Sequence, residues 1–133
     1  LTSDEHWNGI TEDGLGGEAI AIGDIVSLHT DGEWYLAGNA IAHDTAGDAR
    51  RKLGVACTTS SNANPITVLL YGKFRHDAFA VALLVGDVVY VGDTGAVVTA
   101  QPASTDEVIR VIGWGNTEDE LMFAPSPDWI THA

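Results

Sequence analysis

Histidine and cysteine are the side chains of this sequence that most readily bind a transition metal. The five histidines are His6, His29, His43, His76 and His132. None has a second histidine two or four positions away, the spacing that places two ligands on one face of a strand or helix. Cys57 is the single cysteine, so it forms no intrachain disulfide, and its apolar neighbours predict a small buried residue in a strand. We therefore predict no metal site and no cofactor.

Acid–base chemistry has two candidate patterns. His76 and Asp77 are adjacent, but their context favours a polar turn. Neighbouring carboxylates, such as Glu12 with Asp13 or those of residues 118–120, suit a glycosidase or a calcium site, yet they fall in turns, where acidic side chains are ordinarily solvated. No nucleophile elbow or phosphate-binding glycine loop is present. We therefore expect a protein that is not an enzyme, while a cation bound between subunits stays open.

Composition indicates one globular domain with a strongly acidic surface. The chain has 133 residues, of which 45% are hydrophobic. It carries 19 acidic and 6 basic residues, which gives a formal net charge of −13. This charge repels phosphate backbones and anionic lipid surfaces, so we expect neither nucleic acid nor membrane as a partner. The longest apolar run, residues 78–85, is too short to cross a bilayer.

Short runs of β-branched and aromatic residues, separated by glycines, predict an all-β fold. The expected strands are residues 25–28, 34–37, 53–58, 66–71, 88–91, 96–100, 108–114 and 120–124.

These strands repeat along the chain. Residues 20–28 and 83–91 both consist of three apolar residues, Gly-Asp and four strand-forming residues, and residues 53–55 match 112–114. Because four short strands bury little surface alone, two copies are expected to cover each other. We predict a small antiparallel barrel or sandwich built from two similar four-strand halves, residues 20–75 and 83–125. These halves form a single β domain, residues 18–133, preceded by an extended N-terminal arm, residues 1–17.

The two ends of the chain are expected to contact a neighbour. Residues 1–17 are rich in glycine and acidic residues, which indicates an arm that orders only against a partner. The C-terminal tail contains two prolines and is expected to lie extended over the surface, with a tryptophan against an apolar site. Trp114, in contrast, is expected in the core. The predicted partner-binding residues are Trp7, Ile10, Leu15, Trp129 and Ile130.

Several segments of the chain form a recognisable set. They are Leu-Gly-Val-Ala at 53–56, the strand and Gly-Lys-Phe-Arg at 67–75, residues 85–91, 94–96 and 101–113, and the ending at 123–129. These segments resemble the head-decoration (capsid cement) proteins of tailed phages and related phage virion or fibre modules. The resemblance spans roughly residues 18–130 and rests on glycines and strands. It implies a non-enzymatic, β-rich subunit that forms a homotrimer and clamps onto a lattice of the major capsid protein, with an arm that orders on the shell. Compared with that family, this chain is unusually acidic.

The leading functional hypothesis is a structural virion protein on the capsid exterior that stabilises the shell by binding to it. The alternative is a receptor- or glycan-binding module of a phage tail fibre or a surface adhesin, in which exposed aromatic side chains contact sugar or protein. Binding to capsids favours the first hypothesis, and binding to glycans without affinity for capsids favours the second.

Overall fold

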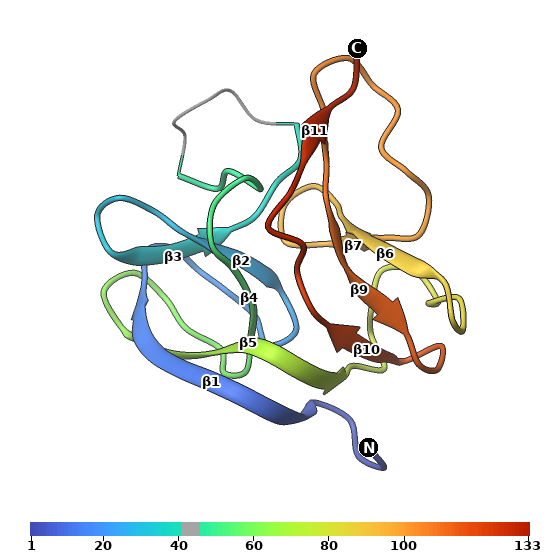
Figure 1. Cartoon of the computed structure of the whole chain (residues 1–133). Coiled ribbons are helices and arrows are strands. Elements are labelled where there is room, and N and C mark those ends of the chain that lie inside the picture. Colours follow the sequence, from blue (N-terminus) through green and yellow to red (C-terminus); the bar gives the residue numbers. More distant parts are fainter. Residues whose placement is uncertain (41–45) are drawn as a thin grey trace.

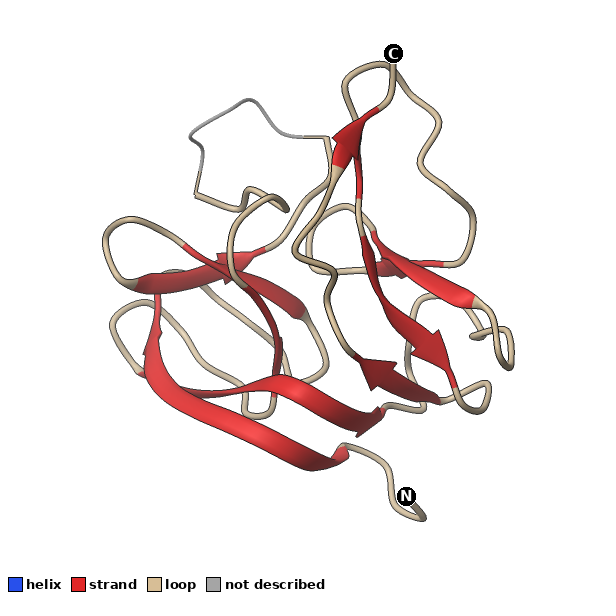
Figure 2. Cartoon of the chain, viewed as in Figure 1, coloured by secondary structure: helices blue, strands red, loops and turns tan. Residues whose placement is uncertain are grey.

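β-Strands form all of the regular structure in the computed structural model, which describes residues 1–40 and 46–133 (Figure 2). The strands are β1 (His6–Gly16), β2 (Ile25–Leu28), β3 (Glu33–Leu36), β4 (Leu53–Ala56), β5 (Pro65–Arg75), β6 (Val88–Val91), β7 (Val97–Val98), β8 (Val108–Ile109), β9 (Val111–Gly115), β10 (Glu120–Phe123) and β11 (Ile130–Thr131). The predicted all-β class is confirmed, and every predicted strand overlaps an observed one. Within the described ranges, no helix is long and apolar enough to span a membrane.

The two halves of the repeat have the same strand order. In the first half, β2 lies between β3 and β4, and β4 pairs with β5. In the second half, β6 lies between β7 and β9, and β9 pairs with β10. All of these pairings are antiparallel, and β5 also pairs antiparallel with β10, so that one sheet runs through both halves (Figure 1).

The Gly-Asp turn in front of β2 recurs in front of β6. Gly23 and Gly86 have φ angles of +89° and +77°, in the left-handed region that glycine adopts without a steric penalty. The N–H of Gly23 donates to the carbonyl of Ala56 at 2.8 Å, and the N–H of Gly86 donates to the carbonyl of Gly115 at 2.8 Å. The repeat in the sequence therefore corresponds to a repeated turn and a repeated connection to the neighbouring strand.

The N-terminal segment is extended, as predicted, but it is a long strand of the sheet. β1 pairs antiparallel with β5, from His6 opposite Arg75 to Leu15 opposite Pro65, and its last residues pair parallel with β3. β1, β3, β2, β4 and β5 thereby close into a barrel (Figure 1). The expectation that residues 1–17 order only against a partner is wrong, because β5 of the same chain supplies the hydrogen-bonding groups that β1 needs.

A pair of glycines allows β1 and β5 to approach closely. Gly9 lies opposite Gly72, whose φ is +137°. A Cβ atom on Gly72 would collide with the carbonyl oxygen of Asn8, and one on Gly9 would collide with that of Tyr71. Side chains at these positions would therefore separate the two strands.

Two hydrophobic cores lie on opposite faces of the first half. The core inside the barrel consists of Ile20, Val26, Trp34, Ala56, Ile66 and Val68. The larger core, shared by both halves, includes Ile25, Val55, Leu69, Phe74, Val89, Ile112, Leu121 and Phe123. The pairing of β1 with β5 skips Leu70, which forms a bulge and keeps Leu69 and Phe74 in the same core despite their odd separation.

Candidate functional site

One surface of the long sheet carries large apolar side chains that remain exposed. Ile10 of β1 lies opposite Tyr71 of β5, and these residues are 62% and 51% exposed. Two strands further along the sheet, Trp114 of β9 is 43% exposed and lies between Val88 of β6 and Met122 of β10. Residues opposite each other in paired strands share a face of the sheet, as do residues two apart in one strand. We call Ile10, Tyr71, Val88, Trp114 and Met122 the outer face.

Lys73 links the two ends of the outer face. It lies opposite Met122 and two residues along β5 from Tyr71, and it is exposed. The nearby Glu120 is buried, and burial raises the pKa of its carboxyl group. Hydrogen bonds from the amino terminus and from Asn116 outweigh this effect, so that the pKa of Glu120 lies below its usual value. The outer face thus presents an exposed cation among apolar side chains, next to a carboxylate with partners in its own chain.

The repeat identifies the first-half counterpart of the outer face. When residues 20–28 are aligned with 83–91, and residues 53–55 with 112–114, Val88 corresponds to Ile25 and Trp114 to Val55. The structure agrees with this alignment, because Ile25 lies opposite Val55 in the first half just as Val88 lies opposite Trp114 in the second half. Ile25 and Val55 are 0% exposed because they belong to the core shared by both halves, whereas Trp114 is 43% exposed. The outer face is therefore the second-half counterpart of a surface that the fold covers in the first half.

The prediction that Trp114 belongs to the core is wrong. Its neighbours Gly113 and Gly115 lie opposite Phe123 and Leu121, which are buried, so the alternation of β9 turns Trp114 to the other face. The Gly-Trp-Gly alternation is visible in the sequence. Which face of β9 is buried depends on how the two halves of the domain pack against each other. The residues around Trp114 contain no signal for this packing.

The predicted partner-binding residues do not form one surface. Trp7 and Ile10 lie near the beginning of β1 and Leu15 near its end, and Trp7 and Leu15 are 38% and 45% exposed. Trp129 and Ile130 lie at or beside β11, on the opposite side of the molecule from β1 (Figure 1). Of these five residues, Ile10 is the one that belongs to the outer face.

Trp7 lies on the other side of β1 from Ile10. It is opposite Phe74 in the strand pairing, and the two rings stack with their centroids 6.4 Å apart. Phe74 is fully buried. Trp7 therefore covers the edge of the larger core and packs within its own chain.

The C-terminal tail is held by cationic side chains. The guanidinium carbon of Arg50 lies 5.4 Å from the ring centroid of Trp129, a cation–π contact. Ile130 lies opposite Ile109 of β8 and is 64% exposed. The tail is extended over the surface, as expected. An apolar site was expected for its tryptophan, and the contact that the structure shows for Trp129 is with the guanidinium group of Arg50.

His76 and Asp77 have separate partners. Asp77 accepts a hydrogen bond from Nε of Arg75 at 2.9 Å. The ring of His76 packs edge-on against Phe79, and its Nδ1 lies 3.9 Å from a carboxylate oxygen of Asp4. Each side chain thus fixes the turn after β5 through a different contact, as the polar-turn interpretation predicts.

Cys57 is buried, as predicted from its neighbours, but it lies directly after β4 rather than within a strand. Burial raises the pKa of its thiol to about 12. His43 lies outside the described residues.

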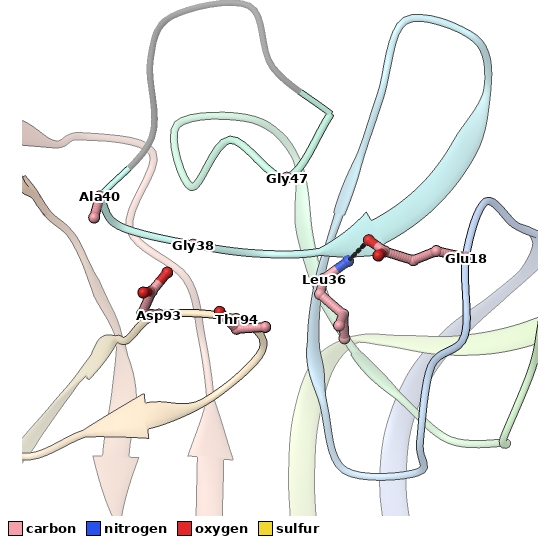
Figure 3. Close-up of a pocket in the computed structure, with 7 residues that line it drawn as sticks. All are labelled: Glu18, Leu36, Gly38, Ala40, Gly47, Asp93 and Thr94. Carbon is pink, nitrogen blue, oxygen red and sulfur yellow. Dashed lines mark hydrogen bonds between the residues drawn. The ribbon is translucent and has the colours of Figure 1, made fainter.

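A pocket of about 270 Å³ lies beside β3 and the turn between β6 and β7 (Figure 3). It is lined by Glu18, Leu36, Gly38, Ala40, Gly47, Asp93 and Thr94. The carboxylate of Glu18 accepts a hydrogen bond from the backbone N–H of Leu36 at 3.0 Å, so this group stabilises β3. Nowhere in residues 1–40 and 46–133 do three His, Cys, Asp or Glu side chains come close enough to share a metal ion.

Comparisons with known proteins identify no relative. No family model, no curated protein and no solved structure matches the chain. The resemblance to head-decoration proteins therefore stays a prediction from sequence, and the outer face is the feature of the structure on which a functional proposal can be based.

Proposed function

We propose that this domain is a structural virion protein that binds the exterior of a phage capsid through its outer face and stabilises the shell without catalysing a reaction. The observation that carries the proposal is the exposure of Trp114, beside the half-buried Val88, because the first-half counterparts of both residues are fully buried. Exposed apolar patches of this kind mark sites where proteins bind one another. The resemblance to head-decoration proteins supports the shell of the major capsid protein as the partner.

The aromatic side chains of the outer face supply the driving force for this binding. The exposed parts of Trp114 and Tyr71 amount to 43% and 51% of these residues. At about 25 cal/mol per Å² of apolar surface, their burial would contribute about 2–3 kcal/mol each. Copies that bind side by side on a closed lattice add their contributions, so a modest affinity per copy is sufficient to hold the shell together.

Co-sedimentation with capsids tests the proposal. The capsids are assembled from the major capsid protein of a tailed phage, and the outer-face variant carries Tyr71→Ser together with Trp114→Ser. A matched control replaces Leu84 and Trp129, which are 51% and 41% exposed and lie off the outer face, by serine. We expect the outer-face variant to bind at least about tenfold more weakly, and the control to bind like the wild type.

Two results would contradict this proposal. If the wild-type domain does not sediment with capsids, the capsid is not its partner. If the Leu84 and Trp129 control loses binding while the outer-face variant keeps it, the binding surface includes Leu84 or Trp129 and is not the outer face.

A glycan- or receptor-binding module of a tail fibre or adhesin is the second candidate. The observation in its favour is the pair of exposed aromatic rings, Trp114 and Tyr71, on one face with Lys73 between them. Aromatic rings of this kind stack on the apolar faces of sugars. Binding of the wild-type domain to a glycan array, lost in the variant with serine at both aromatic positions and unaccompanied by capsid binding, would establish this function instead.

A further inference from the structure

The outward edge of β1 is free to pair with another strand. β1 pairs with β5 along the whole of one edge, whereas along the other edge its pairing is confined to Leu15 and Gly16 with β3. Among the strands that the structure describes, none lies along residues 6–14 on that side. Proline and lysine, which natural proteins use to block such edges, do not occur in residues 6–14.

We propose that a second copy of this chain occupies this edge, with β1 of one copy antiparallel to β1 of the other. The free edge, residues 6–14, has Ile10 at its midpoint. An antiparallel copy therefore pairs over the full length of the edge in one register, in which Ile10 lies opposite Ile10 of the second copy. The two-fold axis that relates the two copies then passes between their Ile10 residues.

Charge restricts the register in which two copies can pair. Two copies with a formal net charge of −13 repel each other, so a contact between them must avoid opposing carboxylates. In the register centred on Ile10, Glu12 lies opposite Asn8 of the second copy, and Asp13 lies opposite Trp7. No carboxylate of the free edge then lies opposite another.

Both carboxylates of the free edge are also engaged within their own chain. Glu12 forms an ion pair with Nζ of Lys52 at 3.0 Å. Asp13 accepts a hydrogen bond from the hydroxyl group of Thr67 at 2.9 Å. These contacts hold the acidic side chains toward the rest of the domain and leave the backbone of the edge open to the second strand.

The pairing has a defined consequence for the quaternary structure. A two-fold axis perpendicular to the sheet extends it from one copy into the next and turns both outer faces to the same side. The product is a dimer, in place of the homotrimer that the resemblance to decoration proteins implies. It needs no capsid, so its test is independent of the proposed function.

Light scattering on the full chain tests the dimer. Ile10→Lys places a positive charge on each side of the two-fold axis, and Ile130→Lys is the matched control, because Ile10 and Ile130 are 62% and 64% exposed. We expect the wild type and the Ile130→Lys variant to have the mass of two chains. Ile10→Lys is expected to raise the dissociation constant of the dimer by about tenfold or more. At dilutions where the wild type and both variants are monomeric, all three are expected to have the same thermal unfolding.

Disulfide trapping tests the register. Because Cys57 is buried, a cysteine introduced at the surface is the reactive thiol. Ile10→Cys is expected to form an intermolecular disulfide on mild oxidation, since opposed Cα atoms of paired strands lie about 4.5–5.5 Å apart. Asn8→Cys is expected to form no intermolecular disulfide under the same conditions, because equivalent positions would be about 13 Å apart. A wild type with the mass of one or three chains, a dimer that Ile10→Lys leaves intact, or trapping of Asn8→Cys as efficient as that of Ile10→Cys would overturn the proposal.

Discussion

Arg110 is a buried cation that links the C-terminal tail to the loop before β4. It is 7% exposed, and its guanidinium group donates hydrogen bonds to the carbonyl oxygens of Ser126 at 2.8 Å, Ala49 at 2.9 Å and Arg51 at 2.5 Å. Burial lowers its pKa from the usual value of an arginine. We predict that Arg110→Met, which keeps an unbranched apolar side chain but removes the guanidinium group, destabilises the domain.

The magnitude of this effect follows from two opposing contributions. Each hydrogen bond from a charged donor contributes about 1.5–3 kcal/mol, so the loss of three amounts to roughly 4–9 kcal/mol. Removing a buried charge also removes a desolvation penalty of several kcal/mol. We therefore expect a net loss of about 2–4 kcal/mol in the free energy of unfolding. For a domain of this size, such a loss lowers the melting temperature by about 10 °C.

Urea denaturation followed by circular dichroism measures this difference, and fluorescence of the four tryptophans, which include Trp129 in the tail, gives a second signal. Lys73→Met is the control, because it also replaces a cation by methionine but at an exposed position, and its expected effect is within about 0.5 kcal/mol. If Arg110→Met is as stable as Lys73→Met, the three carbonyl groups are satisfied without the guanidinium group, and the reasoning is wrong.

Three further predictions concern single positions. Gly72→Ala, which places a methyl group against the carbonyl oxygen of Asn8, is expected to destabilise the domain by about 3 kcal/mol or more in thermal unfolding. The control Gly32→Ala, where φ is +85° but no atom lies within 4 Å, is expected to cost about 1 kcal/mol. Burial raises the pKa of Asp48, but the hydrogen-bonded Arg50 outweighs this and holds the pKa below 3.8. The resulting stabilisation is present above pH 3.8 and is lost as the pH falls through the folded-state pKa, so unfolding measured from about pH 5 to 2 should be less acid-sensitive in Asp48→Asn. Because the pKa of Cys57 is about 12, its thiol should resist an aromatic disulfide reagent at pH 8 in the folded protein and react in urea; rapid reaction without urea would refute its burial.

Turns and individual strands are the features of the fold that were predicted well from the sequence. The turn at Gly23 was recognisable because Gly-Asp before a strand supplies a positive φ, and its copy at Gly86 repeats the pattern. The strands between such turns followed from β-branched and aromatic residues. Each of these features depends on residues that are neighbours in the chain, so one sequence was sufficient to find them.

The assignment of β1 and of the outer face needed contacts between distant residues. Residues 6–16 contain glycines and acidic residues that do not favour a strand alone, and they form one because β5 lies beside them. The sequence showed that Trp114 and its neighbours Gly113 and Gly115 lie on opposite faces of a strand. It did not show which of these two faces is exposed to solvent. Ile10 was predicted to bind a partner, yet Tyr71 and Met122, its companions on the outer face, were not.

By itself the sequence determined the all-β class, the duplicated four-strand unit and the acidic character of the surface, because composition, turn chemistry and periodicity are properties of short segments. Only the tertiary structure decided that β1 closes a barrel, that Trp114 faces solvent while Val55 is buried, and that the carbonyl groups of two distant segments meet at Arg110. Strand registers and the packing of one half on the other are set by the free energy of the whole molecule.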